Sequence, residues 1–222
     1  MISLLLRSRL FWLDLARLQV GFFLFGLAIA LMLEAQIGLD PWSAFHDVAS
    51  RRSGWSFGRI SQVTGLVLIV GSRVMLAVRP GIATVLNMLS IGPWVDVIRP
   101  FVGFADGFGS GVLQFLFAIP VLGMGTAVYV GASLGAGPRD GLAMGLSRRI
   151  GKSLRASRTG VEVTVLLVAV ALGGSIGWGT VIFALLMGPT MQTCLRLFRV
   201  SHDPSPVYRR YGVHTPCSGE VG

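Results

Sequence analysis

Charged side chains are scarce in this sequence of 222 residues: Asp, Glu, Lys and Arg make up 13% of it, whereas 53% is hydrophobic and the mean hydropathy is +0.71. Water-soluble domains carry about twice that charged fraction, so a soluble protein is excluded. The charges separate apolar runs of about 18 to 24 residues, the length that a helix needs to cross a hydrocarbon core. The composition therefore predicts an all-α, polytopic bundle of transmembrane helices.

Cysteine and histidine are also few, with two and three residues. Two cysteines are too few for a disulfide framework or a zinc site. A bridge is not expected either, because Cys194 lies in an apolar run and Cys217 in the polar tail. Two of the three histidines lie in that tail, so no metal site is predicted. His46 beside Asp47 is a candidate proton-handling pair.

Enzyme motifs are missing as well. The sequence contains no Gly-x-x-x-x-Gly-Lys-Ser/Thr phosphate loop, no His-Glu-x-x-His metal motif and no Gly-x-Ser-x-Gly nucleophile elbow. The glycine-rich stretch 131–145 resembles a dinucleotide fingerprint only superficially, because it follows a membrane helix and not a β-strand. We therefore expect neither an enzyme nor a bound cofactor.

The net charge of +9 would suggest a nucleic-acid partner, but the positions of the basic residues argue against one. They flank six apolar runs, at about residues 18–37, 60–78, 82–98, 112–134, 159–176 and 178–195. If the N-terminus is cytoplasmic, every basic residue falls on the inside except Arg51, Arg52, Arg59 and Arg99. The positive-inside rule thus predicts a multi-pass plasma-membrane protein with both termini in the cytoplasm.

The chain repeats itself at a spacing of about 97 residues, which divides the membrane part into two halves. The matching elements are 35–41 with 132–138, Arg51-Arg52 with Arg148-Arg149, and, one residue closer, Gly92-Pro93 with Gly188-Pro189. We expect an N-terminal cytoplasmic or interfacial segment at 1–17, membrane repeats at 18–101 and 112–198, and a disordered cytoplasmic tail at 199–222. Three spans per repeat force the two copies to cross the membrane in opposite senses, as in many transporters.

Each repeat also contains a short predicted helix after its first span, at 41–52 and at 138–149. Asp40 can cap the first of these helices, and Pro41 suits its first position. Both helices are too short to cross a membrane, so each is either re-entrant or interfacial. The Gly-Pro steps Gly92-Pro93 and Gly188-Pro189 interrupt the third and sixth spans, and we expect both to face protein and not lipid.

The sequence resembles a known family over roughly residues 18–198. The residues that carry the resemblance are Leu39-Asp40-Pro41-Trp42, the Leu-Gly-Ala-Gly-Pro-Arg-Asp-Gly-Leu stretch at 134–142, Glu162, and the glycine-rich run 173–181 that leads to Gly188-Pro189. They are similar to the YczE/YyaS/YitT group of bacterial membrane proteins, most closely its YczE-like branch. The resemblance implies an integral membrane protein and brings no agreed substrate or catalytic residues.

Polar groups at membrane depth are costly, which makes them candidates for binding a solute. The candidate residues are Glu34, Gln36, Asp40, Trp42, Asn87, Asp96, Arg139, Asp140, Glu162 and Gln192. Glu34 either serves this purpose or reaches water at the membrane surface. Asp96 either pairs with Arg99 or lines a cavity, and Glu162 is expected to pair with Arg158 one turn away.

Arg139 poses a specific question, because a cation at the start of a helix is unfavourable unless an anion lies near it. A substrate anion, a lipid headgroup or Asp140 would each supply that anion, whereas Asp140 by itself suits a capping role. The leading functional hypothesis is a transporter-like protein that moves a small solute by alternating access between the two repeats. The alternative is a non-transporting membrane factor that binds lipid or a partner protein through its basic cytoplasmic loop.

Overall fold

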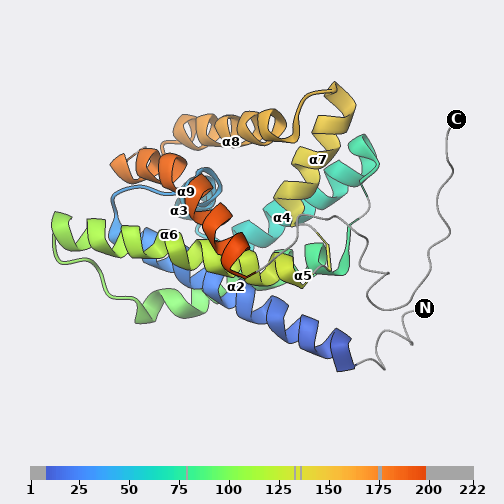
Figure 1. Ribbon diagram of the computed structural model, residues 1–222. Helices are drawn as coiled ribbons and strands as arrows, with labels where there is room; N and C mark the ends of the chain where they lie inside the picture. The colour runs from blue at the N-terminus through green and yellow to red at the C-terminus, as the bar shows by residue number, and fades with distance from the viewer. Residues whose placement is uncertain (1–8, 79, 133, 136, 175–176, 199–222) are drawn as a thin grey trace, which may run out of the picture.

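The computed structural model describes residues 9–78, 80–132, 134–135, 137–174 and 177–198, and all regular elements in these ranges are helical (Figure 1). They are α2 (Arg9–Ala35), α3 (Pro41–Ser53), α4 (Phe57–Leu76), α5 (Ile82–Ile98), the 3-10 turn η1 (Arg99–Phe101), α6 (Phe108–Gly131), α7 (Pro138–Ile150), α8 (Leu154–Ala171) and α9 (Trp178–Leu197). The predicted all-α class is therefore confirmed for this part of the chain. The predicted disordered tail lies outside the described residues.

Four of these helices, α2, α4, α6 and α9, are long and apolar enough to cross a membrane. Helix α5 is shorter, with 17 residues, and α8 carries three charged residues in its first half. A count of six spans thus stays a prediction. Among the described residues the first helix, α2, begins at Arg9, well before the predicted start at residue 18. It includes the buried Asp14, which pairs with Arg17 across 3.2 Å within the same helix.

Helices α2 and α6 form the centre of the bundle and run antiparallel. Gly21 contacts Gly125 and Tyr129 near one end of the pair, and Ala35 contacts Gly111 near the other. A Cβ atom on Gly21 would lie 2.8 Å from the Cβ of Tyr129, so the small residue permits this close approach. The fully buried side chains of this layer include Phe22, Ile29, Phe115 and Ile119.

The two short helices pack crosswise between the two halves of the chain. The short helix α3 packs against α8 of the second half, and the short helix α7 packs against α4 of the first half. In addition, α2 packs on α5 and α6 packs on α9. Each half therefore buries its short helix against the other half, and both short helices are integrated into the protein.

The turns after the two short helices have the same geometry. Each short helix ends at a left-handed glycine, and each next helix begins at a serine cap. In each turn a serine hydroxyl donates to the carbonyl of the residue directly before that cap. The matching groups, 97 positions apart, are Gly54 and Gly151, Ser56 and Ser153, and the bonds Ser50 Oγ to Trp55 O at 2.6 Å and Ser147 Oγ to Lys152 O at 2.7 Å. Equal local structure at this spacing agrees with the repeat in the sequence.

The two Gly-Pro steps differ in their surroundings. Gly92 is buried, and a Cβ placed on it would lie 2.6 Å from the carbonyl oxygen of Gly58 in α4. Gly188 and Pro189 are exposed, and the described residues leave open space beside Gly188. The expectation that both steps face protein is thus correct for the first and wrong for the second within one chain, because α9 lies at the edge of the bundle.

Candidate functional site

Two loops, one just before each short helix, are hydrogen-bonded to the opposite half of the chain. The carbonyl oxygen of Ile37 accepts a hydrogen bond from the backbone N–H of Gly179 at 2.8 Å, and that of Leu134 accepts one from Ala83 at 3.1 Å. Ile37 and Leu134 are equivalent positions in the two repeats. Each loop is therefore attached to the beginning of the third long helix of the opposite half.

Thr180 strengthens the first of these attachments. Its hydroxyl donates to the carbonyl oxygen of Leu39 at 2.9 Å and accepts from the Leu39 N–H at 3.3 Å. The loop reaches this position through Gly38, whose φ of +148° suits glycine, and Gly135 has a φ of +121° at the equivalent place. A Cβ on Gly38 would lie 2.5 Å from the backbone nitrogen of Thr180, so the two chains touch here.

Asp40 follows this loop and begins helix α3. Its Oδ2 atom accepts hydrogen bonds from the backbone N–H groups of Trp42 and Ser43, both at 3.2 Å, as the predicted cap requires. The same oxygen lies 3.7 Å from Nη1 of Arg139, the second residue of α7. A buried carboxylate of the first half thus faces a cation of the second half.

Arg139 therefore has its anion, but it is Asp40 and not the neighbouring Asp140. The guanidinium carbon also lies 5.0 Å from the centroid of the Trp42 ring, a cation–π contact. Such contacts contribute about 0.5 to 2 kcal/mol, more where water is excluded. Asn87 lies beside the start of the same helix, with its Nδ2 atom 3.5 Å from where a Cβ on Gly137 would be.

Asp140 makes a second set of polar contacts, which connect α7 to α6 and α8. The hydroxyl of Tyr129 donates to Oδ2 of Asp140 at 3.3 Å, and Nη1 of Arg158 lies 3.4 Å from Oδ1. Nε of Arg158 also donates to Oε1 of Glu162 at 3.1 Å, so the predicted pair is present. Sequence reasoning missed Tyr129, because nothing in an apolar run marks which carboxylate its hydroxyl will meet.

His46 lies on α3 close to Arg139, and sequence reasoning did not include it among the binding residues. Its side chain is buried among aromatic rings, with the Phe57 ring 5.4 Å away at 88° and Trp42 at 6.5 Å. Neither ring nitrogen has a hydrogen-bond partner among the described residues, and Asp47 instead bonds Arg51 at 2.8 Å. Burial, and then the charge of Arg139, lower the pKa of His46 well below its usual value.

We call the residues at this junction the central cluster: Asp40, Trp42, His46, Asn87, Arg139, Asp140, Tyr129, Arg158 and Glu162. Six of them are candidates that the sequence predicts. The cluster joins both short helices to α5, α6 and α8, and it combines cations, carboxylates and aromatic rings. Such a set of groups is suited to binding a small polar solute.

Comparison with known proteins gives the chain a family. The model of a family of unknown function, DUF6198, matches residues 13–196. The chain belongs to this family. It is 31% identical over 176 residues to the uncharacterized membrane protein YczE of Bacillus subtilis (79% of this chain, 82% of the relative) and 30% identical over 185 residues to an uncharacterized protein of Haemophilus influenzae (81% and 82%).

The uncharacterized protein YyaS of Bacillus subtilis is 23% identical over 173 residues, which cover 76% of this chain and 86% of the relative. No solved structure matches the chain. The resemblance to the YczE and YyaS group is therefore confirmed, and with it the character of a membrane protein. The central cluster lies entirely within the region that the family model matches.

The remaining candidates lie outside the central cluster. Oε1 of the buried Glu34 accepts from Nε of Arg99 at 2.6 Å. Oδ1 of Asp96 accepts from the backbone N–H of Gly58 at 3.0 Å, so this carboxylate stabilises the beginning of α4 and does not form the predicted pair with Arg99, which bonds Glu34 instead. Gln36 and Gln192 are exposed. Glu34 and Asp96 therefore have structural partners near the meeting point of α2, α4 and α5.

Proposed function

We propose that this family member moves a small solute across the plasma membrane by alternating access between its two halves. The observation that carries the proposal is the contact between Asp40 and Arg139, which joins the N-terminal ends of the two short helices. An ion pair that links two halves is a contact that relative motion of those halves would make and break. In this proposal α5 and α8 are the two further spans, and both termini are cytoplasmic.

The proposal includes an inverted repeat, and several contacts support it. The antiparallel α2 and α6, the crosswise packing of α3 and α7, and the equal turns at Gly54 and Gly151 are what two oppositely oriented copies would produce. Secondary transporters of this architecture bind solute where the two repeats meet, at irregular backbone between short helical segments. In this proposal the loops at Ile37 and Leu134, each hydrogen-bonded to the opposite half, are that place.

The geometry of the pair favours a solute with an anionic group. The separation of 3.7 Å between Asp40 and Arg139 exceeds the 2.7 to 2.9 Å or so of a direct charge-assisted hydrogen bond. Asp40 already accepts two backbone hydrogen bonds, so its charge is shared. A solute carboxylate or phosphate would compete well for Arg139, while the Trp42 ring keeps the guanidinium in position.

Cysteine accessibility in proteoliposomes tests the proposal. In a background in which Cys194 and Cys217 are replaced by alanine, single variants Ser43→Cys and Asn87→Cys place a thiol beside Asp40 and beside Gly137 at the start of α7 respectively. A membrane-impermeant thiol reagent is added from either side, with and without a panel of small organic anions, and uptake of labelled solute is measured in parallel. We expect a transported anion to raise labelling from one side and lower it from the other.

Ser53→Cys, at the exposed end of α3, is the control and should react equally in all conditions. Unchanged labelling at both test positions with every solute, together with no uptake, would reject transport. The alternative of a non-transporting factor predicts a different pattern. In that case neutralising the basic residues of 148–158 abolishes the cellular function, whereas Arg139→Gln leaves it intact.

A further inference from the structure

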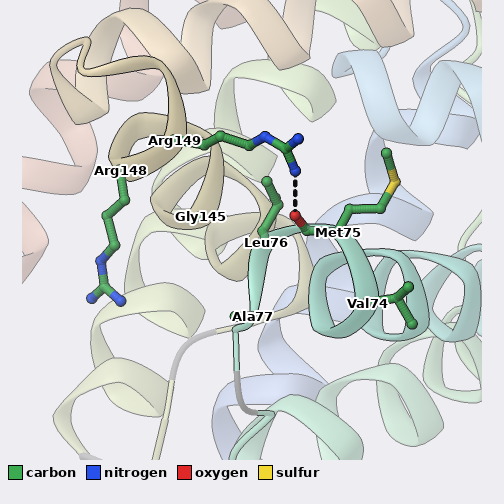
Figure 2. Close-up of a pocket in the computed structure, with 7 residues that line it drawn as sticks. All are labelled: Val74, Met75, Leu76, Ala77, Gly145, Arg148 and Arg149. Carbon is green, nitrogen blue, oxygen red and sulfur yellow. Dashed lines mark hydrogen bonds between the residues drawn. The ribbon is translucent and has the colours of Figure 1, made fainter.

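A second feature lies away from the central cluster, where α4 and α7 end side by side. Here the surface forms an open hollow of about 340 Å³ (Figure 2). Its lining consists of Val74, Met75, Leu76, Ala77, Gly145, Arg148 and Arg149. The hollow therefore combines an apolar floor with two arginines at its rim.

The two arginines have different environments. Nη1 of Arg149 donates to the carbonyl oxygen of Met75 at 2.5 Å and so closes the last turn of α4. Figure 2 shows the guanidinium of Arg149 turned toward Met75 and that of Arg148 turned away from it. Arg149 is thus a structural residue, and Arg148 is exposed at the rim.

The first half of the chain shows why Arg148 stands out. Its equivalent, Arg51, is bonded to Asp47 at 2.8 Å, one turn earlier on α3. The position equivalent to Asp47 is occupied by Met144. In the described part of the chain, no carboxylate lies within ion-pair distance of Arg148, so its charge is available to an external anion.

An apolar stripe leads along α4 to this charge. The exposed residues at helical spacing are Val63, Leu66, Val67, Val70 and Val74, with Met75 beside them. Only 11% of the most apolar window of α4 is buried inside the protein. In a membrane this face contacts acyl chains, and it ends at the hollow.

We propose that the hollow binds the headgroup of an anionic phospholipid, with its phosphate on Arg148 and its acyl chains along the α4 stripe. A guanidinium presents paired N–H donors that match phosphate oxygens. The charge distribution predicts that this end of α4 faces the cytoplasm, and basic pockets between helices on that side bind such headgroups. The site has no counterpart in the first half, because Asp47 pairs with Arg51, the residue equivalent to Arg148. It does not depend on the proposed transport.

Native mass spectrometry of retained lipid tests this site. The protein is equilibrated with an equimolar mixture of phosphatidylglycerol and phosphatidylcholine and then released from detergent. Wild type is expected to retain phosphatidylglycerol preferentially. Arg148→Gln should reduce that preference about fivefold, the factor equivalent to about 1 kcal/mol per basic group at an anionic surface. Met144→Asp should act similarly, because it supplies the acid present in the first half.

Arg51→Gln is the matched control, since it removes one charge from the equivalent position and should leave lipid retention unchanged. Equal losses in Arg51→Gln and Arg148→Gln would reject a local site in favour of general surface charge. If Arg148→Gln retained phosphatidylglycerol as strongly as wild type does, the proposal would be rejected. Inorganic phosphate alone should not compete, because the acyl chains supply part of the binding; full competition by phosphate would contradict a phospholipid site.

Discussion

Arg139 of the second half lies 3.7 Å from Asp40 of the first half and over the ring of Trp42. The carboxylate also accepts the two backbone hydrogen bonds that begin α3. One oxygen atom thus serves both as a helix cap and as a link between the halves. A change at either residue is expected to affect local helix stability and the coupling of the halves to different degrees.

Asp40 variants can separate the two roles. Asp40→Asn keeps a capping oxygen and removes the charge, whereas Asp40→Ala removes both, and losing a cap typically costs about 1 kcal/mol. We therefore expect Asp40→Ala to lower the melting temperature in detergent more than Asp40→Asn does. A double-mutant cycle of Asp40→Asn with Arg139→Gln should show a coupling free energy above about 0.5 kcal/mol. Strict additivity would mean that the ion pair contributes nothing.

Gly21 should tolerate no side chain. A Cβ there would lie 2.8 Å from the backbone nitrogen of Tyr129, so Gly21→Ala forces α2 and α6 apart. Overpacking of this kind costs about 1 to 3 kcal/mol. The control is Gly71→Ala on α4, where an added Cβ would have no described atom within 4 Å outside the adjoining backbone of its own helix and where alanine favours the helix. Thermal unfolding should show a large loss for the first variant and no loss for the second.

The turns after the two short helices have the same geometry, so removing the serine cap of either turn should have the same effect on stability. Ser56 accepts from the N–H of Arg59 at 3.3 Å, and Ser153 accepts from that of Ala156 at 3.2 Å. Ser56→Ala and Ser153→Ala should each lower the free energy of unfolding by about 1 kcal/mol, and the double variant by about twice that. Clearly different effects of the two single variants would show that the turns are equivalent in shape and not in energy.

The pair of Glu34 and Arg99 should respond asymmetrically to mutation. The Glu34 side chain is 3% exposed and that of Arg99 is 42% exposed, so removal of the arginine leaves a buried carboxylate without its counter-charge. Breaking a buried pair in this way costs about 3 kcal/mol or more. Arg99→Gln is therefore expected to destabilise the protein more than Glu34→Gln, as measured by unfolding in detergent. The reverse order would indicate that water reaches Glu34.

Several features were predictable because they depend on residues close in sequence or on composition. Hydrophobic runs predicted the helices, and the motif residues identified the family. The pair of Arg158 and Glu162 follows from one helical turn. The unfavourable position of Arg139 correctly predicted that an anion must lie near it.

The identity of that anion was not predictable, because Asp40 approaches Arg139 only after the two halves have packed together. The same holds for His46, whose environment includes Phe57 from the next helix. The two Gly-Pro steps show the limit most directly. They share a local motif, yet Gly92 meets Gly58 while Gly188 faces outward, since burial depends on where the whole helix lies.

The crosswise packing of the short helices has a consequence for biosynthesis. Ala44 and Val48 of α3 are buried together with Ala169 of α8, which the ribosome adds more than a hundred residues later. Until α8 has been made and inserted, this apolar face of α3 lacks its final cover. The first half therefore cannot complete its native packing before α8 has been made.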